Sequence, residues 1–246
     1  MNRKLTLLTA TMMLVLVLTS VSARSQILIS ILLGDKLNNG TIEFGLTGGF
    51  NRTWMYQTEN AEGINHFNLG FYFDFRLKKD MPWYVYTGVL VKSEMGASNI
   101  DTYPLGNPEV DSAMAGGTVN RYIKYFMVPL TIKYRFKNNI FVLAGGQVSL
   151  RHKATDEFTN TIYNKDDLVF KNKTSDNYRR LDAGLTAAAG YKFRYGAMMN
   201  IGVRYYYGLV DVFKTGTGLG YATNSALFVF AEIPIGAERQ IRPEKK

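Results

Sequence analysis

The sequence predicts an all-β protein, an eight-stranded antiparallel up-and-down transmembrane β-barrel. Three observations predict this fold. Eight long segments alternate large apolar residues with small, polar or charged ones, an apolar stretch of signal-peptide form precedes them, and short connections alternate with long ones. Most of the segments match or exceed the roughly 9 to 11 residues that a tilted strand needs to cross a bilayer, whereas strands of globular proteins typically have about 5 to 6. Nothing in the 246 residues marks a second domain.

Residues 1–25 have the form of a cleaved signal peptide. A charged start is followed by the apolar run 5–18 and by small residues, Ala23 and Ser25, that suit a cleavage site. A retained membrane helix is the alternative, but a spanning helix normally needs about 20 apolar residues and this run is shorter. Residues 26–40 are then expected to form a periplasmic N-terminal segment.

Two segments flank the predicted barrel, which covers residues 41–236. The apolar run 27–33 fits a periplasmic strand, a partial plug of the barrel or an extension of the signal, and the sequence leaves these alternatives open. Residues 237–246 form a basic tail that is expected to be periplasmic. The chain carries a formal net charge of +9, but no helix or groove concentrates this charge, which argues against a nucleic-acid partner.

The predicted strands show a period of two, because successive side chains of a strand point to opposite faces. In one of them Phe71, Phe73 and Phe75 take the odd positions, while Asp74 and Arg76 take even ones. The eight strands are predicted at residues 41–55, 66–77, 83–94, 122–136, 140–151, 179–193, 197–211 and 223–236.

The connections between these strands alternate in length. Short turns are predicted at residues 78–82, 137–139 and 194–196, and longer loops at 56–65, 95–121, 152–178 and 212–222. Outer-membrane barrels have short periplasmic turns and long extracellular loops, so both termini are expected to be periplasmic. An even number of antiparallel strands lets the sheet close without an unpaired edge.

Composition indicates which face of the sheet meets lipid. Most strand glycines lie on the polar faces, where small residues leave space inside an eight-stranded barrel that is only just wide enough for its side chains. The bulky apolar faces are therefore expected to face lipid, and the charged side chains to face the lumen. These predicted lumen-facing residues are Asp74, Arg76, Lys92, Glu94, Lys133, Arg135, Arg151, Asp182, Lys192, Arg204 and Glu232. Buried charges must pair or reach water, and a plug of ion pairs is favoured over a conducting lumen.

No catalytic, cofactor or metal site is predicted. The chain has no cysteine, which excludes disulfides, thiolate metal sites and an acylated cysteine anchor. His152 near Ser149 fits the rim of a lipid-modifying barrel enzyme, but an exposed loop histidine is the commoner explanation because nothing fixes a base next to a nucleophile. The glycine-rich residues 215–220 lack the strand-then-helix context of a phosphate-binding loop, so a hairpin loop is expected there.

One strand resembles a known family. Residues 122–136 read Tyr-Ile-Lys-Tyr-Phe-Met-Val-Pro-Leu-Thr-Ile-Lys-Tyr-Arg-Phe, which resembles a strand typical of PorT-like outer-membrane β-barrel proteins. Residues 183–193 and 202–205 are similar to later strands of that family. The resemblance implies a barrel in the outer membrane of a Gram-negative cell envelope. It carries over no functional residue, because most members have no assigned biochemical role, and the basic tail departs from barrels that end on an aromatic residue.

These observations predict a non-enzymatic integral outer-membrane protein whose partner is outer-membrane lipid. Loops longer than about 12 to 15 residues are usually functional or disordered, so the loops at residues 95–121 and 152–178 are expected to contact an extracellular ligand or protein. The alternatives are a narrow porin-like channel for small solutes, a soluble carrier barrel, and a lipid-modifying enzyme.

Overall fold

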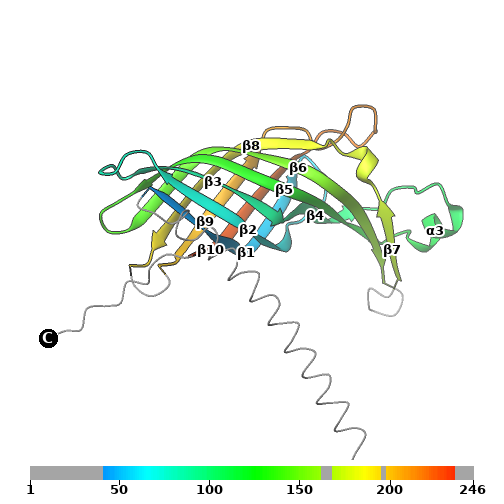
Figure 1. Ribbon diagram of the computed structural model, residues 1–246. Coiled ribbons are helices and arrows are strands. Elements are labelled where there is room, and N and C mark those ends of the chain that lie inside the picture. Colours follow the sequence, from blue (N-terminus) through cyan, green and yellow to red (C-terminus); the bar gives the residue numbers. More distant parts are fainter. Residues whose placement is uncertain (1–40, 162–167, 195–197, 236–246) are drawn as a thin grey trace, which may run out of the picture.

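The computed structural model describes residues 41–161, 168–194 and 198–235 (Figure 1). The predicted signal peptide, the segment 26–40 with its apolar run and the tail 237–246 lie outside the described residues. In the part of the chain that is described, no helix has both the length and the apolar character to span a membrane.

Ten strands, one short helix and one 3-10 turn form the described structure. They are β1 (Ile42–Tyr56), β2 (Ile64–Arg76), β3 (Trp83–Lys92), β4 (Glu94–Asp101), α3 (Pro108–Ala113), β5 (Thr118–Arg135), β6 (Ile140–Asn160), β7 (Leu168–Lys173), η2 (Ser175–Asn177), β8 (Leu181–Lys192), β9 (Asn200–Gly208) and β10 (Thr223–Pro234). The described strands pair with one another in antiparallel fashion.

Eight of these strands close into a ring. The order is β1-β2-β3-β5-β6-β8-β9-β10, and β10 pairs back with β1 from Gly45 opposite Pro234 to Tyr56 opposite Thr223. The predicted fold class, an eight-stranded antiparallel barrel, is confirmed. The two remaining strands are not members of the ring: at one end of the barrel, β4 pairs with β5 and β7 pairs with β6. In Figure 1, β7 and α3 project beyond that end of the barrel.

The two faces of the barrel wall carry the expected residues. Leu130, Val229 and Phe50 are 62, 57 and 69% exposed on the outer face. Tyr72 and Tyr206 are fully buried on the inner face. Burying apolar side chains from water drives folding in solution, so an outer wall of this kind is stable only when hydrocarbon covers it. Aromatic rings that contact one another at the short-turn end, such as Trp83 with Tyr134 and Tyr191 with Phe193, form part of an interfacial belt.

Glycine is required where neighbouring strands of the strongly curved wall approach one another on the inner side. A Cβ added at Gly49 would lie 2.0 Å from the Val229 carbonyl oxygen, and one at Gly70 would lie 2.0 Å from the Val89 oxygen. At Gly146, on the outer face, the nearest atom would be 3.9 Å away. The concentration of glycine on the polar face therefore reflects the narrow interior.

The two longest predicted loops are largely ordered secondary structure, which corrects the loop assignments. Residues 95–121 contain most of β4, all of α3 and the first four residues of β5. Residues 152–178 contain the last residues of β6 and the whole of β7 and η2. We call the described parts of residues 94–124 and 152–178 the extracellular extension. The end of the barrel that carries it is called the extracellular end, and the short-turn end is called periplasmic, following the rule for outer-membrane barrels.

The outer face of strands β5 and β6 changes from apolar to polar where the extension begins. Toward the membrane their outer face carries exposed apolar residues such as Phe126 and Leu150. Beyond the register shift between Lys124 and Tyr125 the outer face becomes polar, while the inner face carries buried apolar residues such as Ile123. Because lipid covers apolar side chains only within the hydrocarbon layer, we place the extracellular edge of that layer where the outer face becomes polar.

Candidate functional site: the barrel interior and its extracellular cap

Most of the predicted lumen charges lie inside the ring. Lys133 and Glu232 are fully buried, and Asp74, Asp182 and Arg204 are 1, 1 and 4% exposed. Three others, Arg76, Arg135 and Lys192, are partly buried near the periplasmic mouth, and Arg151 lies at the extracellular rim, where it donates to the carbonyl oxygens of Tyr178 and Arg179.

Two predicted lumen residues lie elsewhere. Residue Val91 has no cross-strand partner on β2, because Lys92 pairs with Leu69 and Leu90 with Gly70. This irregularity places Lys92 on the outer face, with its ammonium 5.6 Å from the centre of the Phe67 ring. Glu94 begins β4, outside the ring, and pairs with Lys124. The prediction that Lys92 and Glu94 face the lumen is wrong, since a single bulge reverses the alternation of all residues that follow.

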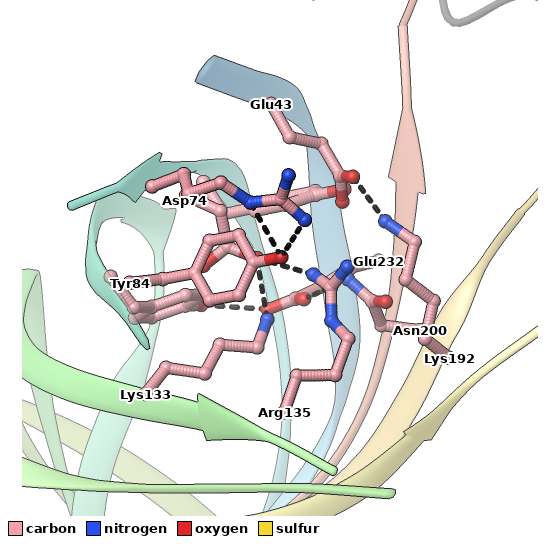
Figure 2. Close-up of polar contacts among 11 residues, drawn as sticks. Glu43, Asp74, Tyr84, Lys133, Arg135, Lys192, Asn200 and Glu232 are labelled. Atoms are coloured by element: carbon pink, nitrogen blue, oxygen red, sulfur yellow. Dashed lines mark hydrogen bonds and ion pairs between the residues drawn. The ribbon is translucent and has the colours of Figure 1, made fainter. Parts of the chain in front are cut away.

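A buried ion pair lies at the centre of the periplasmic half (Figure 2). The Lys133 Nζ atom is 2.6 Å from Asp74 Oδ2, and both side chains are completely inaccessible to solvent. Arg135 Nη2 lies 3.7 Å from the same carboxylate oxygen. The Lys133 ammonium also lies 4.3 Å from the centre of the Phe141 ring, a distance that permits a cation–π interaction.

Further polar contacts link the strands around this pair. Lys192 donates to Glu43, and the Tyr72 hydroxyl donates to Glu43 Oε1 over 3.0 Å. Glu232 accepts a 2.7 Å hydrogen bond from the Tyr86 hydroxyl and a 2.9 Å bond from Asn200 Nδ2 (Figure 2). These contacts join β1, β2, β3, β8, β9 and β10, so the polar interior connects much of the ring.

A second polar group lies toward the extracellular half. Asp182 accepts from the Tyr206 hydroxyl over 3.1 Å and from Asn224 Nδ2 over 2.9 Å, and the same amide nitrogen is 3.2 Å from the Tyr125 hydroxyl. All four residues are buried to within 1% of full coverage. Asp182 and Asn224 thus bond to two tyrosines, Tyr125 and Tyr206, that also belong to the apolar cluster described next.

An apolar cluster fills the extracellular half of the barrel, and we call it the cap. Ring strands supply part of it, and the rest comes from β4, the extracellular ends of β5 and β6, the β9–β10 connection, and the residues that follow α3 and η2. Its buried members are Met55, Leu90, Met95, Ala97, Ile100, Met114, Val119, Ile123, Tyr125, Met127, Ala154, Phe158, Tyr178, Tyr206, Val212, Phe213, Ala222, Ala226 and Phe228. Two hydrogen bonds to the backbone of β4 hold this strand over the mouth. Thr53 Oγ1 donates to the Gly96 carbonyl oxygen over 2.9 Å, and Asn51 Nδ2 donates to the Glu94 carbonyl oxygen.

One buried carboxylate organises the polar part of the cap. Asp156 accepts hydrogen bonds from two nitrogens of Arg121, from Nη2 over 2.9 Å and from Nε over 3.2 Å. The hydroxyls of Tyr103, Tyr178 and Thr174 donate to it at 2.9, 3.2 and 3.3 Å. Burial and the charge of Asp156 raise the pKa of Tyr103, which lies in the connection after β4. The hydroxyl therefore stays protonated and continues to donate at neutral pH.

Several of these residues were missed in the sequence. Glu43 occupies an inward position near the start of β1. Inward and outward residues alternate along β1, and because Leu46 points outward, this alternation predicts that Glu43 points inward. Arg121 and Asp156 were assigned to loops. Their signal was weak, because the strands that carry them lie beyond the membrane, where the outer face is polar as well.

The residues considered for catalysis do not meet. Ser149 is fully buried on the inner face of β6. His152 is exposed on the outer face, and its ring stacks on Phe126 with centroids 4.7 Å apart. Opposite faces of one strand separate the two side chains, so they cannot form a nucleophile–base pair. Among the described residues, no group of three or more histidine and carboxylate side chains has the arrangement of a metal site.

A small cavity opens at the periplasmic mouth. Its volume is about 200 Å³, and its walls include Glu43, Asp74, Arg76, Tyr84 and Arg135. Arg76 donates from Nη2 to the Tyr84 hydroxyl over 2.7 Å.

Several solved structures are similar to this chain at low sequence identity. No curated protein matches the chain. Among solved structures, the attachment invasion locus protein Ail of Yersinia pestis, in complex with the heparin analogue sucrose octasulfate, is similar with a TM-score of 0.39 and 12% identity, covering 79% of this chain and 99% of that one. Neisserial surface protein A has a TM-score of 0.38 and 11% identity over 79% of this chain and 97% of its own. OprG of Pseudomonas aeruginosa has a TM-score of 0.35 and 11% identity over 79% and 93%.

The family itself is shown by a family model. Residues 29–214 match the outer membrane protein beta-barrel domain, which covers well over half of the chain. The expected location in the outer membrane of a Gram-negative cell is thereby confirmed. The chain belongs to the outer membrane protein beta-barrel domain family.

Proposed function

We propose that this protein is a closed, non-enzymatic outer-membrane barrel of the PorT-like group, whose extracellular extension provides a binding surface. The observation that carries the proposal is the cap, which fills the extracellular half of the ring with packed apolar side chains. Hydrated ions and small solutes need a polar path, and burying a polar group without a hydrogen-bond partner costs about 2–7 kcal/mol. The ion pairs in the periplasmic half then serve to hold the strands together.

The extension is well suited to binding because it is built on continuous strands. β5 and β6 pass from the membrane into the extension with 18 and 21 residues. Sites on strands are held more rigidly than sites on flexible loops. We expect residues 95–121 and 152–178 to carry the contacts with an extracellular ligand or protein. Residues 1–25, 26–40 and 237–246 are proposed to be the signal peptide, a periplasmic segment and a periplasmic tail.

A narrow channel is the second candidate, favoured by the cavity at the periplasmic mouth. Planar bilayer recording separates the two. The closed barrel predicts no discrete conductance steps from the purified, folded protein. A channel predicts steps that change when Arg204 or Lys133 is neutralised, and reproducible steps of this kind would contradict the closed barrel. A folded state must be shown in parallel by slower migration of the protein on a gel after boiling.

A further inference from the structure

The outer face of the extracellular extension carries a basic groove. Its volume is about 250 Å³, and its walls include Lys124, Lys153 and Lys171 together with Tyr122, Glu94 and Glu157. The groove belongs to the face of β5, β6 and β7 that points away from the cap. It lies outside the barrel, so neither the lumen nor the proposed closure of the barrel involves it.

The groove has more positive charges than it can neutralise. Lys124 and Lys153 lie directly opposite each other in the register of β5 and β6, a placement that destabilises a sheet when the charges are alike. Lys124 Nζ is 3.0 Å from Glu94 Oε1 and Lys171 Nζ is 2.7 Å from Glu157 Oε2. Lys153 has no carboxylate within ion-pair distance among the described residues.

Two more lysines lie on the same outer face. Lys173 pairs across the sheet with Thr155, and Lys92 lies outside the wall over Phe67. Neither has a carboxylate partner in the described part of the chain. The hydrogen bond to Glu157 and its charge raise the pKa of Lys171, so this ammonium stays protonated. The two glutamates thus hold lysines in place without cancelling the positive charge of the whole face.

The groove begins where the lipid-facing wall ends. Phe126, 38% exposed, is the last outward apolar residue of β5 on this side, and Lys124 follows two positions further from the membrane. At about 3.3 Å per residue, this places the two about 7 Å apart along the strand. His152 stacks on Phe126 between them. Lysine side chains at such a boundary lay their stems on apolar surface and keep the ammonium among the polar headgroups.

We propose that this groove binds the phosphate group of an anionic lipid in the outer leaflet. Lysine ammonium groups act as point charges that bind phosphate. The unopposed charge of Lys153 beside Lys124 is relieved by an anion seated between them. The neighbouring outward rings, Phe67 and Phe126, lie where acyl chains of the same lipid would begin, which favours a lipid headgroup over free phosphate.

The test uses the purified, folded full-length mature protein and a double variant, Lys124→Gln with Lys153→Gln. The probe is diphosphoryl lipid A, titrated into the protein in neutral detergent micelles, with native mass spectrometry reporting the bound fraction. Each lysine near a charged lipid surface contributes about a factor of 5 in affinity, so the double variant is expected to bind about 30-fold more weakly. The variant Lys124→Arg with Lys153→Arg is expected to retain binding.

The matched control removes two exposed lysines from the opposite rim, Lys78→Gln with Lys79→Gln. It changes the net charge equally and is expected to leave binding unchanged. An equal loss in this control, or equal binding of lipid A from which the phosphates have been removed, would overturn the proposal. Displacement of the lipid by an equimolar amount of inorganic phosphate would overturn the lipid as the source of the phosphate. Bilayer conductance is measured separately, so failure here is distinguishable from failure of the closed barrel.

Discussion

Replacing Lys133 by methionine is expected to lower the free energy of unfolding by about 3–5 kcal/mol, because it leaves a buried carboxylate without its main partner. The Lys133 ammonium is 2.6 Å from Asp74, and solvent reaches neither side chain. After the substitution the nearest cation is Arg135, at 3.7 Å. Urea unfolding in detergent micelles, followed by tryptophan fluorescence or gel migration, measures the change.

A second variant separates the loss of charge pairing from the loss of packing. Adding Asp74→Asn to Lys133→Met removes the orphaned charge and is expected to restore much of the stability. The control Lys79→Met changes an exposed lysine of the β2–β3 turn and is expected to shift stability by about 0.5 kcal/mol or less. Equal stability of the Lys133→Met variant and the native protein would mean that the pair lies in contact with water.

A charge placed on the outer wall is expected to produce a comparable loss. Leu130 lies near the middle of the lipid-facing part of β5 and is 62% exposed, which in a bilayer means exposure to hydrocarbon. Leu130→Arg is expected to cost about 2–4 kcal/mol, the range measured for arginine at the midplane of transmembrane barrels. Folding into liposomes, measured by urea titration, gives the difference from the native protein.

The control is the same substitution at a position nearer the membrane surface. Leu181 begins β8 at the extracellular end and is 53% exposed. The same change there, Leu181→Arg, is expected to cost only about 0–1 kcal/mol, because the guanidinium reaches the interface. Similar costs at Leu130 and Leu181 would contradict the placement of the outer wall in hydrocarbon.

The membrane part of the fold could be predicted from the sequence because hydrocarbon imposes a strict rule. Every outward position between the two interfaces must be apolar, and every inward position must fit a narrow, polar interior. The alternation of Phe71 and Phe73 with Tyr72 and Asp74 follows this rule, and Asp74, Asp182, Lys133, Arg204 and Glu232 accordingly lie inside the ring.

Beyond the membrane this rule no longer applies, and the sequence loses the alternation of apolar and polar residues that identifies a strand. In the extension the outer face carries Lys153 and Glu157, while the inner face carries Ala154 and Phe158, both fully buried, and also Asp156. Polar residues on both faces conceal the alternation, so these strands were predicted to be loops. The cap needs contacts between segments far apart in the chain, such as Arg121 with Asp156, which no local pattern encodes.

Local irregularities account for the remaining errors. A bulge adds one residue to a strand, and every side chain after it changes face. The irregularity at Val91 moves Lys92 to the outside in this way. A second shift opposite Tyr125 places both His152 and Lys153 on the exposed face of β6. No residue type in either segment predicts that a bulge occurs there.

The phenylalanine- and leucine-rich face of the barrel meets lipid, and site-directed spin labelling tests this placement most directly. The chain contains no cysteine, so single cysteines at residues 122–134 of β5 can each carry a nitroxide spin label in liposomes. Collision with oxygen reports hydrocarbon, and collision with a water-soluble nickel chelate reports water. We predict high oxygen accessibility at positions 126, 128, 130 and 132, low accessibility to both reagents at 127, 129, 131 and 133, and access of the nickel chelate at 124. Oxygen accessibility at the odd positions, with the even ones protected, would contradict the account.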